Sequence, residues 1–254
     1  MLRFATRHKI VDYPAKRKLQ RYPVPALGGV TIAFGLSIPL IISLFLLHWD
    51  VSPWLFAYLL VMLLLGVIDD IRDLSASVRM CMEVAIVGCF VWGSHMMTIS
   101  LHGLWGIAAL PLWVGIPLSV IAGVGIINSI NMIDGVDGYS SGFCMVACAL
   151  FAALFAYVGE YALCCFMLIC IGAIMPFFCH NVFGCRTKMY IGDGGTLMLG
   201  AVMSSMVFFI LQDGSPVAVP SAHNLCYVAF CLAVLCIPVF DTLRVMCSRI
   251  RRGV

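Results

Sequence analysis

Charged residues are scarce in this chain, and their scarcity excludes a soluble globular domain. Only 11% of the 254 residues are Asp, Glu, Lys or Arg, whereas 63% are hydrophobic and the mean hydropathy is +1.06. A soluble domain carries charge on roughly a quarter of its residues. No segment is long and polar enough to fold in water, so we expect residues 1–254 to form a single membrane domain. The net charge of +3 is too small to indicate nucleic-acid binding.

Paired cysteines are also missing, although the chain contains 13 cysteines. No C-x-x-C pair occurs, and most cysteines lie within apolar runs, as Cys144, Cys148 and Cys170 do. Packing as small apolar residues explains them better than disulfides or a metal site. We expect no cleavable secretory signal, because the first 26 residues are basic and polar and contain no short apolar core.

The sequence instead consists largely of long apolar runs. Eight recur along the chain, most of them near the roughly 20 residues that a helix needs to cross a bilayer. They predict an all-α, polytopic membrane bundle of about eight transmembrane helices. The runs cover residues 27–47, 51–68, 80–97, 104–127, 140–158, 161–179, 196–211 and 225–245.

The positive charges are distributed on one side of this arrangement. All 15 Lys and Arg residues lie in residues 1–21, after the second run, after the sixth run, or at the end of the eighth. With eight spans these four segments share one side of the membrane, and the connections on the other side contain no Lys or Arg. The positive-inside rule makes that side the cytoplasm. The sequence therefore predicts that both termini are cytoplasmic.

Acidic residues gather where the apolar runs meet the basic side. Asp69, Asp70 and Asp73 follow the second run. Acids at membrane depth are costly and indicate function, although any single one is equally well explained as an interfacial charge. If the helix continues, Asp69 and Asp73 share a face, and Asp70 points about 100° away from Asp69. The two adjacent acids would then differ in role, one binding metal or acting as a base and the other orienting a loop.

Polar residues also close the fourth run. Asn128, Asn131 and Asp134 recur at every third position and should line one helical face until Gly135 ends the helix. Their oxygens are hard ligands suited to Mg²⁺ or Mn²⁺. Two asparagines would also suit hydrogen bonds between helices, but that explanation does not cover the Asp134-Gly-x-Asp137-Gly exit.

Glycines precede the seventh run, in the order Gly192-Asp193-Gly194-Gly195. A glycine turn that opens a helix can bind an anion through backbone N–H groups; Lys188 would add charge, and Asp193 could hold a metal. The order of a Walker A motif is absent, and an ordinary helix start is the simpler explanation of the glycines alone. Together the three clusters predict a cytoplasmic site at the membrane edge for a divalent cation and a phosphate-bearing ligand.

In order and spacing these motifs resemble those of the polyprenyl-phosphate N-acetylhexosamine-1-phosphate transferases, glycosyltransferase family 4. The likeness covers residues 10 to about 250 and favours the branch that uses UDP-N-acetylglucosamine over the branch of peptidoglycan synthesis. The matching patterns are Asp69-Asp70-x-x-Asp73, Asn128-x-x-Asn131-x-x-Asp134-Gly-x-Asp137-Gly and Lys188-x-x-x-Gly192-Asp193-x-Gly195-Thr196, preceded by Val11-Asp12-x-Pro14-x-x-Arg17-Lys18 and Pro25-x-x-Gly28-Gly29.

The resemblance implies an enzyme of the bacterial inner membrane that initiates cell-envelope polysaccharide synthesis, such as that of lipopolysaccharide O-antigen. Polyprenyl (undecaprenyl) phosphate attacks the β-phosphorus of a UDP-sugar and UMP leaves, with Mg²⁺ or Mn²⁺ as cofactor. Direct attack and a covalent enzyme intermediate both fit the sequence. The implied partners are these two substrates and membrane lipid, with a homodimer as a candidate assembly. The site residues carried over are Asp193 and Asn131 as metal ligands, Asp69, Asp70, Asp134 and Asp137 as catalytic residues, and Asn128, Arg79, Lys188, Gly192, Gly194, Gly195 and Asn181 as substrate-binding residues.

The sequence also departs from the family pattern. Gln20 stands where the family has a histidine, and the chain begins inside the family's first cytoplasmic loop. A later loop rich in His and Arg, with two further helices, does not follow Arg252. The resemblance therefore predicts a chain truncated at both ends and weak or absent activity, because part of the positive charge around the nucleotide would be lost.

Two other interpretations stay open. An inactive remnant of the same enzyme would keep every motif and lack only turnover. A membrane transporter would also have many spans and intramembrane acids, but it would place the carboxylates near the middle of the membrane rather than at the ends of the spans.

Overall fold

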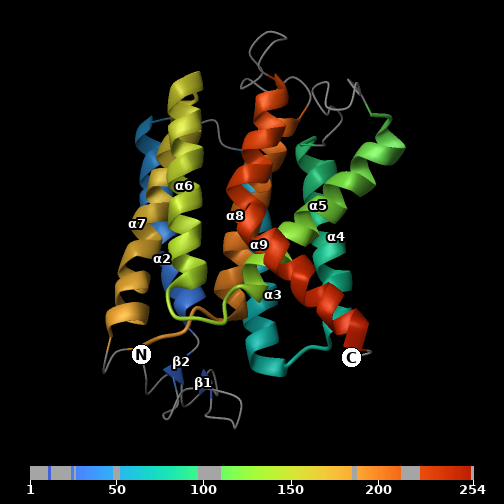
Figure 1. Cartoon of the computed structure of the whole chain (residues 1–254). Helices are drawn as coiled ribbons and strands as arrows, with labels where there is room; N and C mark the ends of the chain where they lie inside the picture. The colour runs from blue at the N-terminus through green and yellow to red at the C-terminus, as the bar shows by residue number, and fades with distance from the viewer. Residues whose placement is uncertain are drawn as a thin grey trace.

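The structure, a computed structural model, describes residues 11–12, 24–25, 27–47, 52–96, 110–184, 188–212 and 224–252. Within these ranges eight helices form one bundle (Figure 1). They are α2 (Gly28–Leu47), α3 (Pro53–Arg72), α4 (Ala76–Ser94), α5 (Leu112–Met132), α6 (Tyr139–Val158), α7 (Tyr161–Phe183), α8 (Gly192–Leu211) and α9 (Asn224–Arg252). Seven are long and apolar enough to cross a membrane, and α2 contributes a shorter apolar stretch, Gly28–Ile42. The predicted all-α membrane bundle is confirmed, with one helix for each apolar run.

The ends of several helices lie beyond the predicted runs, where polar residues continue the helix. α3 extends to Arg72, and α5 extends to Met132. α8 begins at Gly192 rather than at residue 196, so the glycine motif forms its first turn. α5 begins at Leu112 because Pro111 precedes it as the N-cap residue; residues 104–109, where the run was predicted to start, lie outside the described part.

A short ladder accompanies the helices. β1 (Val11–Asp12) pairs antiparallel with β2 (Val24–Pro25). Figure 1 places this pair beneath the bundle, near the start of α2. It lies at the end of the molecule where the acidic motifs are found.

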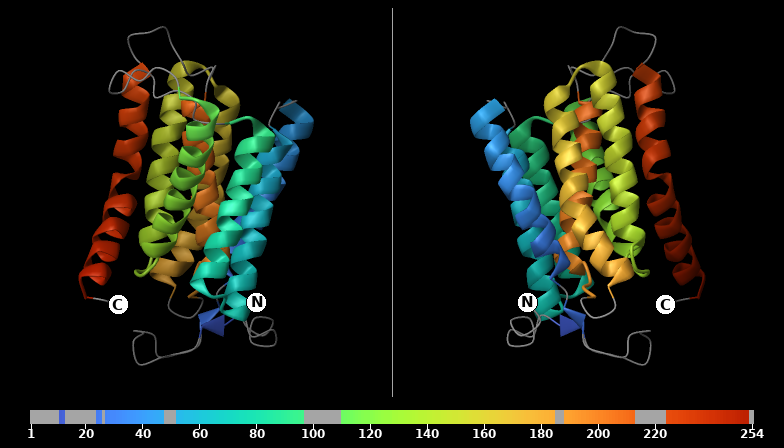
Figure 2. Two further views of the ribbon diagram at one scale, coloured as in Figure 1. Left: turned by 90° about the vertical axis from the view of Figure 1, so that its right-hand side faces the viewer. Right: turned by 90° about the vertical axis from the view of Figure 1, so that its left-hand side faces the viewer.

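The helix α8 is the centre of the bundle. Nearly all of its residues are buried, and it packs mainly against α3, α5 and α2. Both side views show it enclosed by other helices (Figure 2). A helix that is apolar all round belongs in the interior, and small residues allow membrane helices to approach closely. Gly195 faces Gly29 of α2, and Gly200 faces Ile127 of α5, so glycines set how near these neighbours come.

The positive charges of the described residues gather at one end of the bundle, which we call the basic end. Arg72 ends α3, Arg79 lies in the first turn of α4, and Lys188 precedes α8. The arginines of α9 lie in its last three turns: Arg244, Arg249, Arg251 and Arg252. The predicted segregation of charge therefore corresponds to one end of the folded molecule.

Gly66 provides a test of the close packing between α3 and α8. A Cβ atom added to Gly66 would overlap the backbone of Asp193 and Gly194, and overpacking of this kind costs about 1–3 kcal/mol. We expect Gly66→Ala to lower the melting temperature of the purified protein by several degrees.

Gly172 of α7 is the matched control, because a Cβ atom there meets nothing within 4 Å. Gly172→Ala should leave the melting temperature unchanged or raise it slightly, since alanine is the better helix former. Equal melting temperatures for the two variants would contradict this account of the α3–α8 contact.

Candidate active site

The first contact of the site joins the end of α3 to the start of α8. Asp70 accepts hydrogen bonds from the backbone N–H groups of Asp193 (2.9 Å) and Gly194 (3.1 Å). The first N–H groups of a helix have no partner within the helix, and its N-terminus favours negative charge. Asp70 of α3 therefore accepts the hydrogen bonds of two N–H groups that have no partner within α8. The amide of Gly194 is engaged by Asp70, and its predicted role in binding substrate stays a prediction.

Asp69 faces a different set of partners. Its Oδ1 accepts from the backbone N–H of Leu74 (2.9 Å), and its Oδ2 forms an ion pair with Arg79 Nη1 (3.1 Å). The helix ends at Arg72, and Asp73 is an exposed residue with φ 46°. The conditional expectation that Asp69 and Asp73 share a helical face therefore fails. The expectation that Asp69 and Asp70 point in different directions is met.

Glu83 of α4 is a site residue that the sequence analysis missed. Its side chain is fully buried. Arg79 Nε lies 3.5 Å from Glu83 Oε1, and the amide of Asn128 donates to Glu83 Oε2. Arg79 thus links Glu83 to Asp69. The signal was present, because Glu83 is the single acid within the third apolar run, and buried acids in membrane helices indicate function.

Asn131 and Asp193 come together from positions far apart in the sequence. Asn131 Nδ2 donates to Asp193 Oδ1 (2.5 Å) and to Thr196 Oγ1 (2.8 Å). Asn128 instead turns to α4, where it bonds Glu83. The expected helical face holds for Asn128 and Asn131, which lie three positions apart in α5, but it is wrong for Asp134, because α5 ends at Met132.

Asp134, Asp137, Lys188 and Asn181 form a second group beside the first. Lys188 Nζ contacts Asp137 Oδ2 at 2.5 Å, and this hydrogen bond raises the pKa of Lys188. The positive charge expected to serve the start of α8 is therefore paired with Asp137. Asn181 accepts from the backbone N–H of Gly138 (2.6 Å) and donates to the carbonyl of Met189 (2.8 Å). It ties the turn after α5 to the segment before α8.

Asp134 lies in the turn between α5 and α6. Ser140 Oγ donates to its Oδ1 at 2.5 Å. The residue as a whole is exposed, but desolvation of its carboxyl group by neighbouring atoms raises the pKa of Asp134 to about 6. A carboxyl that titrates near neutral pH is suited to proton transfer.

We call Asp69, Asp70, Glu83 and Asp193 the acidic cluster. Asp69 and Asp193 lie within electrostatic reach of each other and of both Asp70 and Glu83. Among the described residues, Arg79 is the cation that interacts with Asp69, Glu83 and Asp193. Several carboxylates with one guanidinium leave negative charge that burial makes costly. When its four carboxyl groups are ionised, the cluster has an excess of negative charge that a cation would offset.

Asp193 and Asn131 are the side chains of this region that could bind a divalent metal ion. No three His, Cys, Asp or Glu side chains in the described ranges converge closely enough to enclose a metal. Mg²⁺ is commonly held by only one or two carboxylates, with water and substrate phosphates completing the shell. Asp193 with Asn131 fits that mode, since rotating the Asn131 amide by 180° would present its oxygen beside Asp193 Oδ1.

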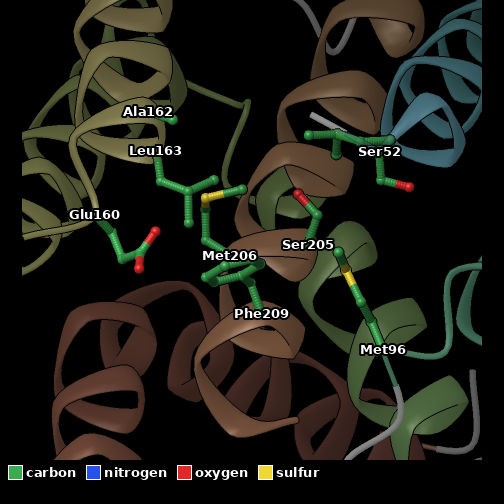
Figure 3. Close-up of a pocket in the computed structure, with 9 residues that line it drawn as sticks. Ser52, Met96, Glu160, Ala162, Leu163, Ser205, Met206 and Phe209 are labelled. Atoms are coloured by element: carbon green, nitrogen blue, oxygen red, sulfur yellow. The ribbon is translucent and has the colours of Figure 1, made fainter. Parts of the chain in front are cut away.

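A cavity of about 90 Å³ lies at the opposite end of the bundle (Figure 3). Glu160 is the charged residue in its lining, together with Ser52, Leu55, Met96, Ala162, Leu163, Ser205, Met206 and Phe209. None of the predicted site residues lines it. The acidic cluster at the basic end is therefore the candidate site.

Comparison with known proteins identifies the family of the chain. Residues 52–211 match the model of glycosyl transferase family 4. The undecaprenyl-phosphate alpha-N-acetylglucosaminyl 1-phosphate transferase of Escherichia coli (strain K12) is 26% identical over 251 residues, which cover 96% of this chain and 65% of that protein. The probable undecaprenyl-phosphate N-acetylglucosaminyl 1-phosphate transferase of Bacillus subtilis (strain 168) is 26% identical over 249 residues, which cover 98% of this chain and 66% of that protein.

The chain thus spans about two thirds of the length of these curated relatives. The matched region begins just before α3 and ends with α8. It therefore contains every residue of the acidic cluster and of the second group. Because the family model covers more than half of the chain, the protein belongs to glycosyl transferase family 4.

Proposed function

We propose that this protein transfers a sugar-1-phosphate, N-acetylglucosamine-1-phosphate in particular, from a UDP-sugar to polyprenyl phosphate. An oxygen of the lipid phosphate forms a bond to the β-phosphorus of the UDP-sugar. The bond from that phosphorus to the bridging oxygen breaks, and UMP leaves with this oxygen. The observation that carries the proposal is the acidic cluster at the start of α8 in a chain of this family.

Asp193 and Asn131 are the residues that would hold Mg²⁺ or Mn²⁺. A divalent cation there supplies positive charge to the pyrophosphate and stabilises the charge that develops during phosphoryl transfer. Thr196 orients Asn131 through its hydroxyl group, at 2.8 Å from Asn131 Nδ2. Asp70 holds the start of α8, so that Asp193 keeps its position.

Asp69 is our candidate for contact with the lipid phosphate. Its Oδ2 is 3.1 Å from Arg79, a positive group that can also attract a phosphate. Glu83 holds Arg79 from the other side, and so acts as a positioning residue. Asp134 and Lys188, with Asp137, are the candidates for contact with the nucleotide or sugar at the second group.

The test is the reaction itself. Purified protein is incubated with UDP-N-acetylglucosamine, undecaprenyl phosphate and Mg²⁺, and UMP and lipid-linked sugar are measured together. We expect equimolar products that depend on all three additions. UMP release without lipid product would contradict transfer to the lipid.

Asp193 gives the first prediction from this proposal. Asp193→Asn removes the charge next to Asn131, and we expect the rate to fall by about 10²–10³, the usual effect of losing one positioned electrostatic group. Glu160→Gln is the matched control, because Glu160 lies at the opposite end of the bundle. A loss of the same size in both variants would place the chemistry elsewhere.

The two neighbouring aspartates should respond unequally. Asp70 accepts from two N–H groups of α8 through its two oxygens. In Asp70→Asn one of these N–H groups would face an amide NH2 group, and an unsatisfied buried donor costs about 1–3 kcal/mol, so the substitution should lower both the melting temperature and the rate. Asp69→Asn should reduce the rate with a smaller change in melting temperature, because its main partner is the half-buried Arg79. Thermal unfolding and turnover are measured on the same preparations; identical behaviour of the two variants would contradict these roles.

We also propose that the basic end faces the cytoplasm in a bacterial inner membrane, which follows from the distribution of positive charge. Alkaline phosphatase is active only outside the cytoplasm, so fusions after residues 74 and 252 should be inactive. A fusion after residue 160, between α6 and α7, should be active. An active fusion after residue 74 would reverse the orientation.

A further inference from the structure

We propose that the last turns of α9 bind the headgroup of an anionic phospholipid. The site is a hollow on one face of this helix, and we call it the α9 hollow. Its volume is about 420 Å³, and it is lined by Arg244, Val245, Ser248, Arg249 and Arg252. This surface is separate from the acidic cluster, and none of its residues takes part in the transfer proposed above.

The spacing along α9 explains why these side chains share a face. Ser248, Arg249 and Arg252 follow Arg244 at four, five and eight positions, which correspond to about one and two helical turns. Three guanidinium groups and a hydroxyl group therefore meet on one side. Guanidinium groups are donors only, and they match the paired oxygens of a phosphate. Arg251 does not line the hollow.

The positive charge of this face is largely uncompensated. Asp241 is the single acid of α9, and it pairs with Arg244 at 2.6 Å and 3.0 Å. No acid among the described residues forms an ion pair with Arg249 or Arg252. The helix C-terminus offsets only about half an elementary charge. An external anion is therefore the partner that the charge favours.

The position of the hollow along the helix favours a lipid over a free anion. α9 has 29 residues and is about 43 Å long, close to the 40–45 Å that separate the outer limits of the two headgroup layers. Its last turns therefore reach headgroup depth. Phe240 and Ile237 lie about one and two turns before Arg244 on its side of α9. They are exposed (70% and 54%), so they can contact acyl chains.

Helix α9 is also open to lipid on its outer side. Figure 2 shows it at the outer edge of the bundle, and its main contact is with α5. A phospholipid could therefore approach from the bilayer without displacing another helix, with its phosphate at the arginines and its chains along Phe240 and Ile237.

The experiment compares two adjacent arginines. Full-length protein in detergent is titrated with dioctanoyl-phosphatidylglycerol, and the rise in melting temperature is followed. The concentration that gives half of the rise should increase about fivefold in Arg252→Gln and about 25-fold in Arg249→Gln/Arg252→Gln, from the usual contribution of one basic residue near an anionic membrane surface. Arg251→Gln removes the same charge outside the hollow and should change this concentration less than twofold.

Three parallel titrations, with dioctanoyl-phosphatidylcholine, inorganic phosphate and farnesyl phosphate, identify the occupant. Phosphatidylcholine and inorganic phosphate should each give no rise in melting temperature that depends on Arg252. Arg252→Lys keeps the charge without the planar fork, and should bind better than Arg252→Gln but less well than the native protein. The proposal is overturned if phosphatidylglycerol has no effect, if Arg251→Gln behaves as Arg252→Gln does, if phosphatidylcholine or phosphate acts equally well, or if farnesyl phosphate displaces the phosphatidylglycerol at lower concentration.

Discussion

The hydrogen bonds from the start of α8 to Asp70 are the contact on which the rest of the site depends. α8 is largely buried from Gly194 onward, and the N–H groups of its first turn have no partner within the helix, so a side chain from another helix is well placed to accept from them. Asp70 supplies that side chain from the end of α3. The same contact holds Asp193 at the basic end of the bundle, where Asn131 of α5 donates a hydrogen bond to it. One capping interaction thereby joins three helices at the candidate site.

This contact requires the glycines around it. Gly66 of α3 and Gly29 of α2 lie so near the first turn of α8 that a Cβ atom on either would overlap its backbone. Gly192 has φ 70°, in the region that favours glycine. The glycines before the seventh run were predicted to bind an anion, with an ordinary helix start as the simpler explanation. In the structure they open α8 and allow three helices to meet, and binding of an anion there stays a prediction.

The buried carboxylates of the acidic cluster cost folding free energy, but they are suited to binding a cation. Arg79 is the cation that Asp69 and Glu83 share, and Asp193 has a neutral amide as its nearest partner. Such an arrangement is expensive for a fold alone, because buried charges need compensation. It is suited to a site that receives a cation together with a phosphate ligand. Other positive charges of the described residues lie apart from the cluster, since Lys188 pairs with Asp137 and the arginines of α9 are exposed.

The sequence by itself determined the class of protein, the number of helices and the segments that carry the chemistry. It could do so because apolar length, charge asymmetry and motif spacing are properties of local sequence. Only the tertiary structure decided which polar groups meet. Asp70 and Asp193 are far apart in the chain, as are Asn131 and Thr196, and their contacts arise from helix packing that no local pattern encodes. Glu83 became a site residue for the same reason: α4 turns its buried carboxylate toward Arg79 and Asn128.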